Sequence, residues 1–276
     1  MLEVSQLGKT YGEGESATHA IGSISFGIEE KEFVCVVGPS GCGKTTLLKC
    51  MSGLLEPSTG RVALKGRQVT GPPPEMALVF QEYSRSLLPW MSVRGNVTLP
   101  LRHKKLGKDE TKRLVEEAVE AVGLTRFIDR YPWELSGGMQ QRVAIARALS
   151  FEPRILLMDE PFGALDEMTR ERLNDEVLRI WEQTGTTIVF VTHSIPEAVY
   201  LSSRVVVMSP RPGRITKVVD IGLPRPRTDE VRESEAYFAL ITEVREALRA
   251  GGEHGDAEVD GGPASARRTA AEGAVG

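Results

Sequence analysis

A glycine-rich segment, "GPSGCGKT", runs from Gly38 to Thr45 and strongly limits the folds open to this chain of 276 residues. It follows the apolar run "FVCVVG", which is typical of a buried parallel strand. It precedes a stretch in which Leu47, Leu48 and Met51 recur at helical spacing. Glycines let backbone N–H groups turn towards one anion, and the start of the following helix adds the positive end of its dipole. The complete G-x-x-x-x-G-K-[ST] pattern therefore predicts a phosphate-binding loop rather than a simple turn.

Two side chains of this loop are suited to a nucleotide. We predict that Lys44 contacts the β- and γ-phosphates and that the Thr45 hydroxyl ligates magnesium. The other residues predicted to surround the phosphates are Gly38, Pro39, Ser40, Gly41, Cys42, Gly43 and Thr46. Because kinases, GTPases and many ATPases share such a loop, it predicts a nucleotide such as ATP with Mg²⁺ but leaves the reaction open.

A pair of acidic residues limits which reaction the predicted nucleotide site can catalyse. The segment "RILLMDE" is strand-like and ends in Asp159 and Glu160. Beside a phosphate loop, Asp159 is suited to holding Mg²⁺ through water, and Glu160 to orienting a water that attacks the phosphate. Adjacent acids at the end of a strand are often only solvent-facing, so this interpretation depends on the phosphate loop upstream. Together with Lys44, the pair predicts hydrolysis of the nucleotide.

The order of the apolar segments predicts an α/β fold. The runs at 154–159 and 186–193 are typical of buried strands, and strands that alternate with helices form a parallel sheet. A helical pattern is present in the region between, where one apolar face comprises Leu114, Val115, Ala118, Val119 and Val122. We predict a core at 1–82 and 153–250, an inserted helical subdomain at 83–152, and a disordered tail at 251–276 that has little to bury.

The segment "LSGGMQQRVAIARAL", from Leu135 to Leu149, resembles the signature sequence of ABC ATPases. Ser136, Gly137 and Gly138 precede a predicted helix, so a hydroxyl and bare backbone amides lie at its positive end. This arrangement predicts a second phosphate-binding surface within the chain. The alternative is that Ser136 is only a helix N-cap.

The resemblance covers the chain from Leu2 to about Asp220. It implies the ABC ATPase fold, with one ABC domain over about residues 2–233, a P-loop NTPase parallel-sheet core, an antiparallel β edge and an inserted α-helical subdomain. The sequence departs from the family at Ser194 and Pro196, in "THSIPEA". This departure puts the course of the following helix in question.

Four further residues resemble functional residues of the family. Tyr11 resembles the aromatic residue that stacks on adenine, and Gln81 the glutamine that touches magnesium and the catalytic water. Asp166 resembles the aspartate of the loop that meets the opposite subunit, and His193 the switch histidine beside the γ-phosphate. The alternatives are, in the same order, an ordinary strand tyrosine, a loop glutamine, a helix N-cap and a structural histidine.

The resemblance also implies a site shared between two copies of the chain. In ABC ATPases the signature segment of one subunit faces the phosphate loop of the other, so two ATP molecules are buried in a homodimer. It implies catalytic roles for Lys44, Glu160 and His193, metal ligation by Thr45, Gln81 and Asp159, and contacts from Ser136, Gly137 and Gly138 of the opposite copy. The implied partners are transmembrane permease subunits and, indirectly, a solute-binding protein.

Other functions are weighed by what the chain lacks. ABC machines of translation usually carry two nucleotide units, and those of DNA repair separate the two motifs by long coiled coils, whereas this sequence has one compact unit. A small-molecule kinase would leave the signature sequence unexplained.

Within transporters, two segments, "QEYSRSLLPWMSVRGNVTLPL" and "SPRPGRI", resemble the nitrate, sulfonate and taurine importer group. The segment Gln81–Pro100 is the candidate for docking the permease. Another ABC transporter class remains the alternative, and the solute stays open.

Charge and composition bear on the partners and the cellular location of the protein. The net charge of −4 supplies no general basic field, so we expect no nucleic acid partner. The apolar runs are too short to cross a bilayer, and the N-terminal segment lacks the pattern of a secretory signal. We therefore expect a cytoplasmic protein, held peripherally on the inner face of the membrane by its permease. Three cysteines, Cys35, Cys42 and Cys50, are expected to be structural thiols.

Overall fold

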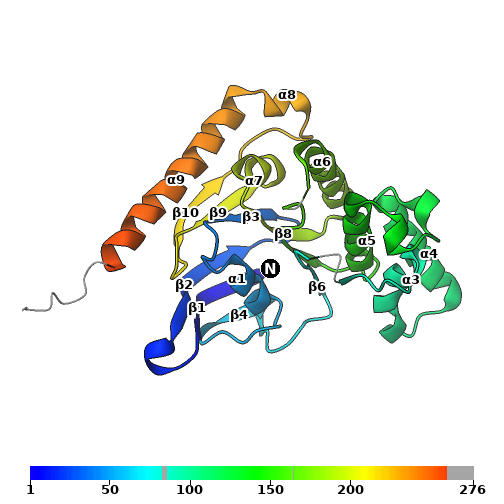
Figure 1. The fold of residues 1–276 in the computed structure, drawn as a ribbon, viewed down its shortest axis with the longest axis horizontal. Helices are drawn as coiled ribbons and strands as arrows, with labels where there is room; N and C mark the ends of the chain where they lie inside the picture. Colours follow the sequence, from blue (N-terminus) through cyan, green and yellow to red (C-terminus); the bar gives the residue numbers. More distant parts are fainter. Residues whose placement is uncertain (83–85, 164, 260–276) are drawn as a thin grey trace, which may run out of the picture.

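The structure is a computed structural model that describes residues 1–82, 86–163 and 165–259. Its centre is a six-stranded sheet in the order β10-β9-β3-β8-β7-β6, in which β10 alone is antiparallel to its neighbour (Figure 1). The strands are β3 (Phe33–Val37), β6 (Met76–Val79), β7 (Ile155–Asp159), β8 (Thr187–Val191), β9 (Arg204–Met208) and β10 (Ile215–Asp220). The predicted parallel α/β sheet is confirmed.

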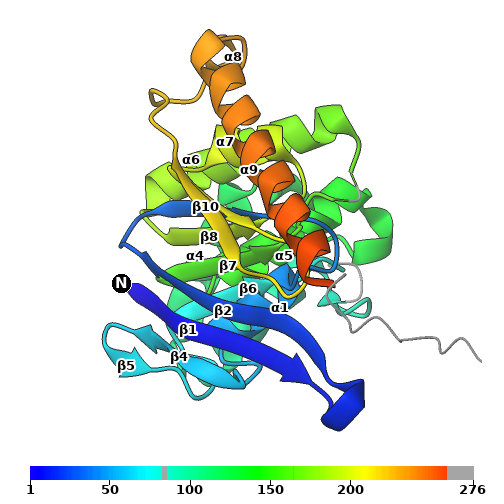
Figure 2. The ribbon, with the colours of Figure 1, turned by 90° about the vertical axis from the view of Figure 1, so that its left-hand side faces the viewer.

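A second, antiparallel sheet in the order β2-β1-β4-β5 forms the other β layer (Figure 2). Its strands are β1 (Leu2–Tyr11), β2 (Thr18–Ile28), β4 (Thr59–Leu64) and β5 (Arg67–Gln68). Helix α1 (Lys44–Met51) packs between this sheet and the central one, because its apolar residues share a core cluster with both. This is the antiparallel β edge that the resemblance implies.

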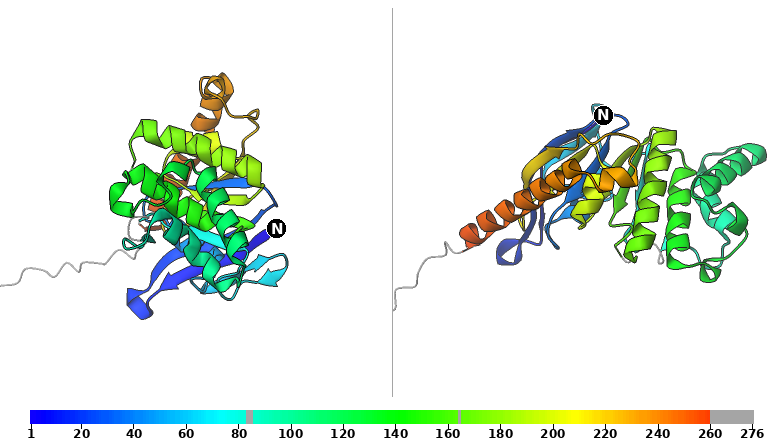
Figure 3. Two further views of the ribbon diagram at one scale, coloured as in Figure 1. Left: turned by 90° about the vertical axis from the view of Figure 1, so that its right-hand side faces the viewer. Right: turned by 90° about the horizontal axis from the view of Figure 1, so that it is seen from above.

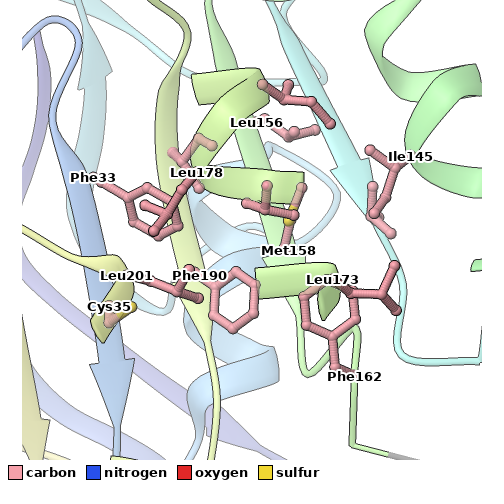
Figure 4. Close-up of a cluster of buried hydrophobic side chains, with 14 of the residues drawn as sticks. Phe33, Cys35, Ile145, Leu156, Met158, Phe162, Leu173, Leu178, Phe190 and Leu201 are labelled. Atoms are coloured by element: carbon pink, nitrogen blue, oxygen red, sulfur yellow. The ribbon is translucent and has the colours of Figure 1, made fainter. Parts of the chain in front are cut away.

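The central sheet is buried on both faces, as its continuous apolar strands predict. Along β3, Val34 and Val36 face the cluster with α1, whereas Phe33 and Cys35 face the cluster with the helices on the other side. Figure 4 shows part of this second cluster, where Phe33 and Phe162 flank Phe190. The three cysteines are buried free thiols, as expected.

The helices other than α1 cover the opposite face and one end of the central sheet. Helices α3 (Val93–Thr98), α4 (Lys108–Ala121) and α5 (Gly137–Leu149) follow β6 and precede β7, and they stand beside the sheet (Figures 1 and 3). Within the described residues, the helices that follow β7 are α6 (Glu167–Thr184), α7 (Ile195–Leu201), α8 (Asp229–Arg232) and α9 (Glu235–Val259). Short 3₁₀ segments are η1 (Gly14–Ser16), η2 (Leu99–His103), η3 (Thr125–Phe127) and η4 (Pro132–Glu134).

The departure at Ser194 and Pro196 leaves helix α7 in place. Ser194 is the N-cap and accepts a hydrogen bond from the Glu197 backbone N–H, while Pro196 lies in the first turn. A proline is tolerated there because the first N–H groups of a helix have no intrahelical partner.

The predicted start of the disordered tail is wrong. Helix α9 continues through Gly251 to Val259. Gly251 is buried, and a Cβ built on it would lie 2.7 Å from Thr216 Cγ2 on β10, so the glycine lets the helix pass close to the sheet. Adding a residue to an existing helix costs less free energy than starting a new helix. The small polar residues after Gly251 therefore continue α9, although their composition by itself suggests disorder. The rest of the predicted tail, 260–276, lies outside the described residues.

In the part of the chain that the structure describes, none of the helices combines the length and apolar character that crossing a membrane requires.

We expect Phe190→Ala to destabilise the fold by about 3–5 kcal/mol, because truncating a fully buried phenylalanine leaves a cavity. The shift of the urea unfolding midpoint measures this loss. Phe238→Ala removes the same atoms from a side chain that is 56% exposed on α9 and should cost less than about 1 kcal/mol. Equal losses in the two variants would contradict this placement of the core.

Candidate active site

The phosphate loop joins the end of β3 to the start of α1, as predicted. Its shape requires glycine at two positions. Gly41 and Gly43 have positive φ angles of 76° and 104°, and a Cβ on Gly43 would lie 2.8 Å from the Ala20 carbonyl oxygen. A side chain at Gly43 would therefore be strained in conformation and would collide with β2.

Lys44 lies folded inside this loop and is only 6% exposed. Its Nζ donates hydrogen bonds to the carbonyl oxygens of Gly38, at 2.9 Å, and Pro39, at 3.2 Å. It also lies 3.6 Å from Glu160 Oε1. The ammonium group thus has a carboxylate and two carbonyls as partners, a set that phosphate oxygens are chemically able to replace.

Glu160 connects Lys44 to His193. Its Oε2 lies 3.0 Å from His193 Nδ1, and its backbone N–H donates to the Val191 carbonyl oxygen beside the end of β8. Glu160 adopts a positive φ of 43°, an uncommon conformation for a residue with a side chain, and such strained residues are frequent at functional sites. His193 is about half exposed, so its ring faces both the carboxylate and open solvent.

Asp159 is the last residue of β7 and has the donor chemistry for a divalent cation. Within the described residues its Oδ1 is buried without a hydrogen-bond partner. Burial raises the pKa of this carboxyl, and the nearby Thr45 hydroxyl partly offsets that rise. Carboxylate and hydroxyl oxygens are ligands that Mg²⁺ prefers, so an unpaired buried oxygen beside a hydroxyl fits that ion.

Gln81 is exposed and follows β6. The parallel register pairs Val79 of β6 with Met158 of β7. The residues that follow these two strands therefore emerge at the same edge of the sheet, which places Gln81 on the side of Asp159 and Glu160.

Tyr11 lies at the end of β1 beside the phosphate loop. Its hydroxyl is 3.2 Å from Thr46 Oγ1, and its ring is 42% exposed. Lys9 Nζ lies 5.6 Å from the ring centroid. The tyrosine therefore presents an accessible aromatic surface next to the loop, which is the placement that stacking on a base requires.

The signature segment and Asp166 begin two neighbouring helices. Ser136 is the N-cap of α5 and accepts a hydrogen bond from the Met139 backbone N–H, and Asp166 is the N-cap of α6 and accepts one from Thr169. Both residues are therefore N-caps, and this capping is compatible with the further roles that the resemblance implies. The Thr169 N–H also holds the pKa of the Asp166 carboxyl below its usual range.

Helices α5 and α6 meet closely at these ends. A Cβ built on Gly138 would lie 3.2 Å from Thr169 Cγ2. Ser136 and Gly137 are exposed, and among the described residues no hydrogen bond or ion pair joins them to the phosphate loop. One copy of the chain therefore brings the loop, the two acids and His193 together but leaves the signature elsewhere. Ala164, beside Asp166, lies outside the described residues.

The sequence interpretation missed Glu197, a buried carboxyl behind His193. The Thr192 hydroxyl donates a hydrogen bond to it, and the Ser194 backbone N–H donates to the same hydroxyl at 3.0 Å. Burial raises the pKa of Glu197, while Thr192, Arg170, Asn174 and His193 oppose the rise. A lone glutamate in a helical pattern gives no sequence signal for such burial, since it resembles any solvent-facing residue.

Comparison with known proteins agrees with this architecture. The family model described as ABC transporter matches residues 21–163. An uncharacterized ABC transporter ATP-binding protein from Methanocaldococcus jannaschii is 50% identical over 88% of this chain and 90% of its own length. An aliphatic sulfonates import ATP-binding protein from Bacillus cereus is 43% identical over 91% of this chain and 97% of its own.

Solved structures lead to the same family. The dimeric structure of an ATP-binding cassette in a post-hydrolysis state, bound to ADP and Pi, superposes with a TM-score of 0.70. It is 32% identical and covers 80% of this chain and 99% of its own. The chain therefore belongs to the ABC transporter family, with the fold that its signature sequence implied. It is an ATP-binding subunit of that family and an ATPase, and its resemblance to the sulfonate-type importer group is confirmed.

We expect Glu197→Gln to raise the thermal unfolding temperature more at pH 8 than at pH 5.5. A carboxyl whose pKa is raised on folding contributes stability below its unfolded pKa and loses it as the pH rises through the folded pKa. The neutral amide lacks this loss, so the variant's advantage should grow with pH. Thermal unfolding of both proteins across this pH range measures the difference. A difference that is constant with pH would contradict the account of Glu197.

Proposed function

We propose that the chain is the ATP-hydrolysing subunit of an ABC importer and energises uptake of a small sulfonate- or nitrate-like solute through a separate permease. The observation that carries the ATPase part is the chain of contacts from Lys44 through Glu160 to His193. It places a cation, a carboxylate and an imidazole next to one another at the phosphate loop, and these groups are suited to binding phosphate and orienting an attacking water.

Hydrolysis needs a positioned water and neutralised phosphate charge rather than a covalent intermediate. In our proposal Lys44 leaves its carbonyl partners for the β- and γ-phosphates of ATP, because an ammonium group gains more from phosphate than from neutral carbonyls. Glu160, released from Lys44, polarises the attacking water. His193 already contacts Glu160 and holds both the carboxylate and the γ-phosphate in place.

Mg²⁺ is proposed as the required ion. Thr45, Asp159 and Gln81 supply hydroxyl, carboxylate and amide oxygens, and the buried unpaired Oδ1 of Asp159 supports this assignment. When bound, the ion neutralises charge on the phosphates. The chain's own part is to orient these oxygens from the ends of β6, β7 and α1.

Two copies are proposed to complete each site. Ser136 and Gly137 are exposed at the positive end of α5, where they are free to meet the phosphates held by another copy. Asp166, at the start of the adjacent helix α6, lies on the same side and is proposed to contact the opposite copy. The dimeric state of the related cassette with ADP and Pi supports this arrangement.

The permease is proposed to dock beside β6. A cavity of about 330 Å³ lies between this edge strand and α5, lined by Val79, Phe80, Pro100, Ala144 and Phe151 among others. Phe80 is 42% exposed there, and Trp90, on the following segment, is 69% exposed. Such an apolar surface is suited to binding a helix of a partner protein. Because it lies next to Gln81, a change at the nucleotide site could be transmitted to that partner. Residues 83–85 of the candidate docking segment lie outside the described residues.

The importer class and the solute rest on relatives. The Bacillus cereus relative is described as an aliphatic sulfonates import ATP-binding protein. By analogy, we propose an importer with a solute-binding protein, and a cytoplasmic chain attached to the membrane through the permease. An ATPase of another ABC transporter class remains the second candidate, because this subunit does not itself contact the solute.

We expect Glu160→Gln to slow ATP hydrolysis by at least about 100-fold, because it removes the group that polarises water. Binding without hydrolysis should also convert the protein from monomer to dimer when ATP and Mg²⁺ are added. Sedimentation velocity measures the change of mass. The same variant with Lys44→Ala should stay monomeric, because it lacks the cation for the phosphates. Full-rate hydrolysis by a wild-type monomer would contradict the shared site.

We expect Trp90→Ser to lower the fraction of the chain that sediments with membranes of its own host by about tenfold, because exposed tryptophans are common anchors of interfaces. Immunoblots of soluble and membrane fractions measure the ratio. ATP hydrolysis by the purified variant should be unchanged. Phe238→Ser, which alters an exposed aromatic residue on α9, is the matched control and should fractionate like the wild type. Equal membrane fractions in all three proteins would exclude docking through this segment.

A further inference from the structure

The loop between β9 and β10, which carries the "SPRPGRI" motif, lies against the phosphate loop. Met208, at the end of β9, is beside the first residue of the phosphate loop: a Cβ built on Gly38 would lie 3.1 Å from Met208 Cβ. The motif follows immediately, and its residues from Ser209 to Arg214 turn back towards β10. The proposed function assigns no task to this segment.

Arg211 forms hydrogen bonds with the backbone of the phosphate loop. Its Nε and Nη2 donate hydrogen bonds of 3.1 and 2.9 Å to the Gly41 carbonyl oxygen. The side chain is exposed, and within the described residues it forms no ion pair. An arginine that directs two N–H groups at one carbonyl, with no carboxylate partner, is holding backbone rather than balancing charge.

Gly213 fixes the other end of the motif. A Cβ on this residue would overlap the Cys42 carbonyl oxygen, so only glycine lets the two loops approach this closely. Its N–H donates to the Ala20 carbonyl oxygen at 3.1 Å, and its own carbonyl accepts from the Gly22 N–H at 3.0 Å. The motif is therefore anchored to β2 and packed on the phosphate loop before Arg211 makes its contact.

We propose that Arg211 is a positioning residue for ATP binding, which sets the orientation of the Gly41–Cys42 peptide in the phosphate loop. A peptide unit is planar, so a carbonyl held outward by Arg211 holds the Cys42 N–H on the opposite side. That N–H donates a hydrogen bond of 3.3 Å to the Pro39 carbonyl oxygen, which also accepts one from Lys44 Nζ, so Arg211 and Pro39 hold the peptide from its two sides. The inference rests on the proposed role of this loop in binding ATP phosphates.

The consequence is a loop whose inward donors are set before ATP arrives. Gly41 has a positive φ of 76° and no side chain to limit its rotation. Without Arg211 only the weaker Cys42–Pro39 hydrogen bond would hold the peptide that follows Gly41, so the peptide would move more and ATP binding would have to order it. This cost falls on binding, whereas Glu160 and His193, which act on the attacking water, are left in place.

The test compares four variants of the full-length chain: Arg211→Ala, Arg211→Lys, Arg214→Ala and Lys44→Ala. Binding of ATP is measured by displacement of a fluorescent trinitrophenyl-ATP probe, and hydrolysis by phosphate release at varied ATP. Arg214 belongs to the same loop, but its side chain packs beside Gly22 rather than on the phosphate loop, so it is the matched control. Thermal unfolding without nucleotide reports whether each variant folds.

We expect Arg211→Ala to raise both the Kd and the KM for ATP by about tenfold, with kcat within about twofold of wild type, since only loop ordering is lost. Arg211→Lys should recover part of the loss, because one ammonium group is able to bond the Gly41 carbonyl without the fork. Arg214→Ala should match the wild type. Unchanged Kd and KM in Arg211→Ala, or a fall in kcat at unchanged KM, would overturn the inference while leaving the proposed function intact. Binding by Lys44→Ala as tight as that of wild type would contradict the proposed function and the inference with it.

Discussion

Parallel hydrogen bonding between β3, β8 and β7 is the constraint on which the rest of the molecule depends. The register pairs Val36 with Val191 and Val191 with Asp159, so the three strands end level with one another. Each strand runs directly into residues of the candidate site: the phosphate loop, His193 and the two acids. Because the carboxyl ends of parallel strands lie at one edge, segments far apart in sequence meet there without a dedicated scaffold.

The energetically unfavourable features of the structure lie at the same edge of the sheet. A buried lysine, an unpaired buried carboxylate oxygen and a glutamate with positive φ all lie there, and each is unfavourable in a folded protein without a ligand. The two apolar clusters on the faces of the sheet supply the stability that tolerates them. The proposed ligands would change this. ATP phosphates would replace the carbonyl and carboxylate partners of Lys44, and Mg²⁺ would give the unpaired oxygen of Asp159 a partner.

The supports of the site come from elements that do not themselves bind phosphate. Glu197 braces the turn that carries His193, and the β9–β10 loop packs on the phosphate loop through Gly213. The Glu197 contacts are local in sequence, whereas Gly213 meets Cys42 from a distant segment, and both supports act on the backbone next to a residue of the candidate site. Rigid supports of this kind matter because phosphate binding depends on the direction of backbone N–H groups.

The sequence alone determined the features that local chemistry controls, namely the strand, glycine loop and helix around Lys44. It offered the N-caps at Ser136 and Asp166 as alternatives, and the structure shows both. The sequence also indicated the family, because the signature is a contiguous segment. Only the tertiary structure decided that Glu197 is buried, that Arg211 holds the Gly41 carbonyl, and that α9 continues past Gly251. These depend on long-range contacts, which leave no periodic pattern in the chain and arise only when distant segments pack together.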